Sequence, residues 1–114
     1  MAIEKFEDIL VWQKSKILTL SIYKSLNPLR DFGFKDQLQR ASVSIMNNIA
    51  EGFERKGDKE FKHFLSIAKG SCGEVRSMLY LACELKYITQ QEFEEYYLQS
   101  IEISRMLAGF MKKL

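Results

Sequence analysis

The stretch from Ala41 to Gly52 constrains the fold most, because it reads as a helix that is apolar around most of its circumference. One narrow polar stripe interrupts it, at spacings of 3, 4, 3, 4 and 4 residues: Gln37, Arg40, Ser44, Asn47, Glu51 and Arg55. A surface helix normally has one apolar stripe and a broad charged face. A helix with the reverse proportions is expected to be covered by neighbours on more than one side.

The other segments carry apolar stripes of the same kind. The third predicted helix has spacings that alternate strictly between 4 and 3: Phe61, Leu65, Ala68, Cys72, Val75, Leu79 and Ala82. The fourth alternates in the same way: Phe93, Tyr97, Ser100, Ser104, Leu107, Met111 and Leu114. The first two carry shorter stripes: Val11, Ser15, Leu18, Ile22 and Leu26, then Leu38, Ala41, Ile45, Ile49 and Phe53. This period packs helices nearly parallel or antiparallel.

Capping and turn signals divide the chain into helices over about 7–26, 35–55, 59–86 and 90–113. Thr89 and Glu92 form a capping box, and Asp58 is a plausible N-cap. The segment from Asn27 to Phe34 is predicted to be a turn, and connections this short make sequential helices antiparallel. We therefore predict an all-α, antiparallel up-and-down four-helix bundle in one domain over residues 1–114. Gly70 and Gly73 inside the third helix are interpreted as a close approach of another backbone.

The bulk composition indicates a soluble globular protein, with 46% hydrophobic and 28% charged residues and a net charge of +2. No apolar run approaches the roughly 18–20 residues of a membrane span, and the first residues lack a signal-peptide pattern. We expect a cytoplasmic protein with no membrane partner. Cys72 and Cys83 would lie about 16 Å apart along one helix, too far for an intrachain disulfide.

Motifs that would indicate catalysis are weak. Glu60-x-x-His63 matches one element of a di-iron bundle, but such a site needs two elements and further glutamates, and the chain has one histidine. Ser66-x-x-Lys69 matches a loose acyl-enzyme spacing without its companion motifs. We expect no enzyme activity, no bound metal and no cofactor.

The polar residues of the second helix have two possible roles. A buried polar group must be hydrogen-bonded. One interpretation is therefore an internal network that fixes helix register, with the following members: Asn47, Asn48, Glu51, Ser71 and Glu74. The other interpretation is that the stripe contacts a partner.

Apolar residues outside the four stripes indicate a second buried surface. A bundle of this size has one core, so an additional apolar face implies self-association or a partner. The interface candidates are on the first two helices: Trp12, Tyr23, Val43 and Met46.

Several motifs, in order, resemble a family of small helical proteins. They are Phe6-Glu7-Asp8-Ile9-Leu10-Val11-Trp12-Gln13-Lys14, Gln37-Leu38-Gln39-Arg40-Ala41-Ser42-Val43-Ser44-Ile45, Asn48-Ile49-Ala50-Glu51-Gly52, Lys59-Glu60-Phe61 with Phe64-Leu65, and Ala68-x-Gly70-Ser71-x-x-Glu74. The chain resembles the family first recognised in intervening sequences of bacterial 23S ribosomal RNA genes. The resemblance implies an antiparallel four-helix bundle, a ring-like homopentamer and no known enzymatic activity. A related branch accompanies the reverse transcriptase of diversity-generating retroelements and binds nucleic acid, but that branch is more basic than this chain.

These observations predict a non-catalytic oligomeric binding module that contacts structured RNA or an RNA-handling protein. The expected phosphate contacts are basic residues at helix ends and on exposed faces: Lys14, Lys16, Arg40, Arg55, Lys56, Lys59, Lys62, Lys69 and Arg76. The alternative is a structural or protein-interaction oligomer in which these residues are only solvated.

Overall fold

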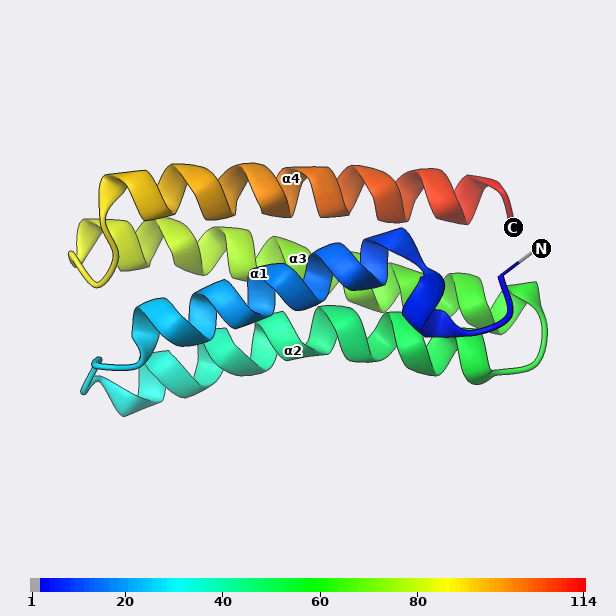
Figure 1. Cartoon of the computed structure of the whole chain (residues 1–114), viewed down its shortest axis with the longest axis horizontal. Helices are drawn as coiled ribbons and strands as arrows, with labels where there is room; N and C mark the ends of the chain where they lie inside the picture. The colour runs from blue at the N-terminus through cyan, green and yellow to red at the C-terminus, as the bar shows by residue number, and fades with distance from the viewer. Residues whose placement is uncertain (1–2) are drawn as a thin grey trace.

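The computed structural model describes residues 3–114, which form an antiparallel up-and-down bundle of four helices (Figure 1). A short 3-10 helix, η1 (Phe6–Asp8), precedes α1 (Leu10–Leu26). The chain continues through α2 (Phe32–Glu54), α3 (Asp58–Glu84) and α4 (Gln90–Lys112). Each helix packs against two others, in the order α1, α2, α3, α4 and back to α1. The start of α1, the end of α4 and the α2–α3 connection lie at one end of the bundle.

The apolar stripes predicted for the first three helices form the core. Every predicted stripe residue of α1 and α3 is buried, and so are those of α2 up to Ile49, whereas Phe53 is half-buried. Ser15 is buried in this core with its hydrogen-bonding capacity satisfied, because its hydroxyl donates to the Val11 carbonyl at 2.7 Å. Thr19 donates in the same way to Ser15. Within the described residues, no helix has the length and apolarity needed to cross a membrane.

The stripe predicted for α4 is partly wrong. Its buried residues are Tyr96, Ser100, Ile103 and Leu107, whereas Phe93, Tyr97, Ser104, Met111 and Leu114 are half-buried. The helix is rotated toward α1, because the Tyr96 hydroxyl lies 2.6 Å from the Ser25 hydroxyl of α1. The residues assigned to the core centre therefore line the edge that faces α3.

The first helix begins later than predicted. Glu7 lies in η1, and Ile9 is extended with its side chain buried before α1 begins at Leu10. Phe6 packs edge-on against Trp12, with ring centroids 5.2 Å apart. The buried Ile9 and the half-buried Phe6 stabilise a break between η1 and α1, and the helical pattern of the sequence does not show this break.

The second helix begins three residues earlier than predicted, so the assignment of Phe32 to Phe34 to a turn is wrong. Asp31 is the N-cap, and one carboxylate oxygen accepts from the Phe34 amide at 3.2 Å. The other oxygen accepts from the Tyr87 hydroxyl at 2.7 Å. Tyr87 lies in the α3–α4 connection, and its ring packs against Phe34. A contact between distant parts of the chain thus supports this cap.

The ends of α3 and α4 follow local chemistry. Gly57, at φ 84°, precedes α3, so Asp58 is the first helical residue and not the predicted cap. The last residue of α3 is Glu84, two residues before the predicted end at Lys86. Lys86 has the left-handed backbone conformation (φ 62°) that is common just after a helix. The capping box is confirmed: Thr89 Oγ1 accepts from the Glu92 amide, and Glu92 Oε1 accepts from the Thr89 amide.

The close approach of helices occurs at a different glycine from those expected. A Cβ atom added to Gly70 or Gly73 would meet nothing within 4 Å, so residues 3–114 of this chain make no close approach there. At Gly52 of α2, an added Cβ would lie 2.6 Å from Phe64 Cβ and 3.0 Å from Phe61 Cδ1. Gly52 therefore sets the separation of α2 and α3.

Replacement of Gly52 by alanine is expected to lower the free energy of unfolding by about 1–3 kcal/mol, because the methyl group overlaps Phe64 Cβ. Gly70→Ala is the matched control. It adds a methyl group in open space and should stabilise α3 by up to about 1 kcal/mol. Urea denaturation measures both. Equal effects of the two substitutions would contradict the close approach at Gly52.

Candidate nucleic-acid interface

Three cations form a row along α3. Lys62, Lys69 and Arg76 are seven residues apart, so they recur on one side of the helix about 10.5 Å apart. Contacts show that this side faces α4. Cys72, one turn from Arg76, donates its thiol to the Ser100 carbonyl at 3.1 Å. Tyr80, one turn beyond Arg76, packs against Phe93 of α4.

The acidic residues in this part of α3 lie on its other side. Glu74 is one turn from Ser71, and Glu60 is one turn from Phe64. Ser71 and Phe64 both face α2, since the Ser71 hydroxyl lies 2.8 Å from the Ser44 hydroxyl and Phe64 covers Gly52. Glu60 and Glu74 therefore lie on a different side of α3 from the three cations, whereas Asp58 and Glu84 at the ends of the helix lie one turn from Lys62 and Tyr80.

Two cations of α4 extend this surface. Arg105 and Lys112 are exposed and also seven residues apart, and helical geometry places them on the outer side of α4, with Glu102 one turn from Arg105. The helices are antiparallel and in register, since Phe61 packs against Phe110 at one end and Tyr80 against Phe93 at the other. Helical geometry thus places Lys112 near the level of Lys62, and Arg105 near the level of Lys69. We call these five residues the α3–α4 basic face: Lys62, Lys69, Arg76, Arg105 and Lys112.

The charges of the basic face affect the pKa of the buried Cys72 thiol. Burial raises the pKa of Cys72 to about 11, and the charges of Arg76 and Lys69 partly oppose this rise. Cys83 is half-buried and also a free thiol. Cys72 is therefore protonated at neutral pH and serves as a small apolar core residue with a weak hydrogen-bond donor.

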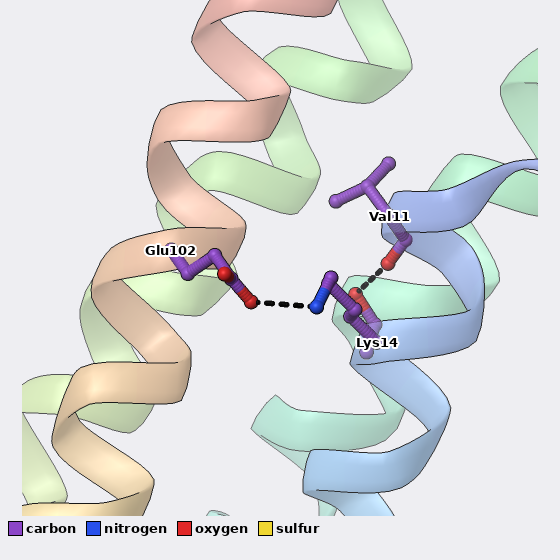
Figure 2. A network of polar contacts seen from close by, with 4 residues as sticks. Val11, Lys14 and Glu102 are labelled. Atoms are coloured by element: carbon purple, nitrogen blue, oxygen red, sulfur yellow. Dashed lines mark hydrogen bonds and ion pairs between the residues drawn. The ribbon is translucent and has the colours of Figure 1, made fainter.

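The structure does not bring the remaining predicted cations into this face. Lys14 of α1 bridges to Glu102 of α4 at 2.9 Å (Figure 2). Lys16 lies over the ring of Trp12, 5.6 Å from its centroid. Arg40 on α2 pairs with Asp36 at 2.8 Å.

The cations of the α2–α3 connection are mixed with acids. Arg55 donates to Glu51 at 2.7 Å, which raises the pKa of the guanidinium, and its guanidinium lies 5.0 Å from the Phe64 ring centroid. Lys56 and Lys59 are exposed, with Asp58 between them in sequence. In residues 3–114, neither of these lysines makes an ion pair, nor does any member of the α3–α4 basic face.

The predicted polar network exists in smaller form. The Asn48 amide donates to both the carbonyl and the hydroxyl of Ser44, at 2.8 and 3.0 Å. The Ser44 hydroxyl in turn contacts Ser71 of α3, so Asn48 and Ser71 are joined through Ser44. The other predicted members, which are exposed and lie outside this network, are Asn47, Glu51 and Glu74. They project beyond the line of contact between α2 and α3.

Comparison with known proteins assigns the chain to a family. Residues 7–109 match the model described as 23S rRNA-intervening sequence protein. The chain belongs to this family. Five chains of solved structures match. One is a protein of unknown function from the S23 ribosomal protein family of Bacteroides thetaiotaomicron VPI-5482, with 30% identity and a TM-score of 0.84. The match covers 90% of this chain and 99% of that one. No curated protein matches.

The family assignment indicates no enzyme class. Among the residues that the structure describes, no three His, Cys, Asp or Glu side chains gather as a metal site would require. His63 is exposed, and its ring lies against Phe64. A pocket of about 710 Å³ lies between the start of α1 and the end of α4, and its walls are mainly apolar.

Exposed large apolar side chains occur on all four helices of this family member, and four of them lie on α1. Leu10, Ile17 and Leu20 are each more than half exposed, at 55%, 57% and 51%. Among the predicted interface residues, Tyr23 is 42% exposed. The others are half-buried within the chain: Trp12, Val43 and Met46. The exposure of Leu10, Ile17 and Leu20 could have been predicted from the sequence, since they are apolar and belong to no predicted stripe.

Replacement of Asn48 by alanine is expected to destabilise the fold more than replacement of Glu51. Asn48→Ala should lower the free energy of unfolding by about 1–2 kcal/mol, because it removes two hydrogen bonds beside a half-buried serine pair. Glu51→Ala removes only an exposed ion pair within one helix and should cost at most about 0.5 kcal/mol. Urea denaturation of the two variants tests this order. A larger loss for Glu51→Ala would show that Glu51 has buried partners.

Proposed function

We propose that this protein is a non-catalytic, self-associating module that contacts structured RNA through the α3–α4 basic face. The observation that carries the proposal is the grouping of five exposed or half-exposed cations, none of them in an ion pair within residues 3–114. Unpaired cations release counterions when they meet phosphates, and this release drives sequence-independent binding. The family's description, 23S rRNA-intervening sequence protein, records where its genes lie, so the proposal rests on the cations.

The arrangement of the cations favours a folded RNA over a flexible strand. Lys62, Lys69 and Arg76 extend over about 21 Å of one rigid helix. Arg105 and Lys112 form a second row on α4, at the interaxial distance of about 8–10 Å usual for packed helices. A fixed two-row array complements phosphates that are themselves held at fixed positions, as in double-stranded RNA, which proteins recognise largely by its shape and backbone.

Self-association is proposed on separate grounds. Leu10, Ile17 and Leu20 form an exposed apolar strip on α1, and exposed apolar surface of this kind marks interaction sites. The strip is on a different helix from the basic face, so subunit contacts through α1 would leave the cations of α3 and α4 accessible. The family resemblance leads us to expect five subunits.

The second candidate function is a protein-interaction oligomer that binds no nucleic acid. The exposed apolar strip favours it, because such a surface accepts a protein partner as well as another subunit. An RNA-handling protein would be one such partner. The two functions differ in salt dependence: RNA binding weakens steeply as salt rises, whereas apolar association persists.

We expect the full chain to bind a labelled RNA hairpin with an affinity that falls with salt. The triple variant Lys62→Gln, Lys69→Gln and Arg76→Gln should lower the slope of log affinity against log salt by about 2–3, since each phosphate contact contributes nearly 1. The control is Lys14→Gln, Lys16→Gln and Arg40→Gln, which removes the same charge elsewhere. An equal loss in both variants, or no binding at low salt, would contradict the proposed interface.

The strip on α1 makes a second prediction. Wild-type protein should have a mass in solution several times the 13.3 kDa of one chain, and five times if the resemblance holds. Ile17→Glu should shift the mass toward one chain, because it places a charge within the strip. Leu81→Glu, at a similarly exposed leucine of α3, is the control. Light scattering measures the mass, and a monomeric wild type would refute self-association.

A further inference from the structure

Three aromatic rings lie at one end of the α3–α4 basic face. The Tyr80 centroid is 5.1 Å from that of Phe93 and 5.7 Å from that of Tyr97. Phe93 and Tyr97 stack on one another at 5.5 Å, with an interplanar angle of 28°. Arg76, the last cation of the α3 row, lies one helical turn before Tyr80. The row of charges therefore ends in an aromatic cluster.

Tyr80 is the open member of this cluster. Half of its surface is exposed, whereas Phe93 and Tyr97 are half-buried in the α3–α4 seam. Its ring makes angles of 56° and 74° with the two neighbouring rings, so neither neighbour stacks on it in parallel. The neighbouring Tyr97 phenol raises the pKa of Tyr80, and the contacts with the Phe93 and Tyr97 rings restrain the Tyr80 ring. Tyr80 thus combines a restrained position with a large accessible surface.

Packing alone does not require this exposed ring. The stacked pair of Phe93 and Tyr97 already covers the adjoining part of the seam from α4. An aromatic ring beside an arginine is, by contrast, the combination that holds an unstacked base: the ring stacks on the base and the cation neutralises the adjacent phosphate.

We propose that Tyr80 stacks an unpaired base of the RNA that the α3–α4 basic face binds. The ligand class is then a duplex interrupted or bordered by an unpaired nucleotide, with the stem along Lys62, Lys69 and Arg76. This inference rests on the proposed RNA-binding function and adds a preference for unpaired bases.

The test compares two labelled RNA hairpins with the same stem, one fully paired and one with a single bulged 2-aminopurine. Wild-type protein is expected to bind the bulged hairpin about tenfold more tightly and to quench its fluorescence on stacking. Tyr80→Ala should lose this tenfold advantage and the quenching while binding the paired hairpin as wild type does. Tyr80→Phe should keep both, because the ring remains.

Phe32→Ala is the matched control, since Phe32 is an exposed aromatic residue (64%) that belongs to α2. It should leave the tenfold advantage intact, and thermal unfolding of each variant verifies that it is folded. Equal affinity of wild type for the two hairpins would overturn the stacking inference and leave the proposed function standing. So would a Tyr80→Ala variant that keeps the advantage, or one that also loses the paired hairpin. Failure of wild type to bind either hairpin would overturn the proposed function and this inference together.

Discussion

The close contact between α2 and α3 is the constraint on which the rest of the bundle depends. Gly52 has no side chain, so Phe61 and Phe64 of α3 lie directly against α2. Two turns toward the start of α2, the Ser44–Ser71 hydroxyl pair continues the contact with small polar groups. Aromatic packing at one point and a hydrogen bond at another fix both the separation and the register of the two helices.

That contact also determines which sides of α3 remain free. With Phe64 and Ser71 directed to α2, the helical repeat directs Cys72 and Tyr80 to α4. The cations one turn from these residues then lie at the outer edge of the α3–α4 seam. The same rotation separates them from Glu60 and Glu74. The basic face is thus a consequence of how the core orients α3, even though none of its residues belongs to the core.

The sequence predicted correctly the helices in which one apolar stripe is clearly defined. The stripe of α3 was correct because its alternating spacing continues without a phase shift from Phe61 to Ala82. In α4, Tyr96 and Tyr97 are adjacent aromatic residues, and only the contact of Tyr96 with Ser25 decides which one is buried. The beginning of α2 was missed because Phe32 and Gly33 resemble a turn, and the support of Asp31 by Tyr87 comes from 56 residues away.

The candidate interface was predictable in part for the same reason. Lys62, Lys69 and Arg76 share one helix, so their spacing was visible in the sequence. Arg105 and Lys112 join them only through the antiparallel pairing of α3 with α4. Pairing of Arg40 with Asp36, four residues away, could have been foreseen from helical spacing. Pairing of Lys14 with Glu102 could not, because it depends on how α1 and α4 pack.

Asp31 has a consequence for the order in which the chain assembles. One carboxylate receives two donors, the Phe34 amide from its own helix and the Tyr87 hydroxyl from the distant α3–α4 connection. The first turn of α2 therefore reaches its full stability only after the second half of the chain has docked. The cap of the second helix and the α3–α4 connection therefore stabilise one another through a single side chain.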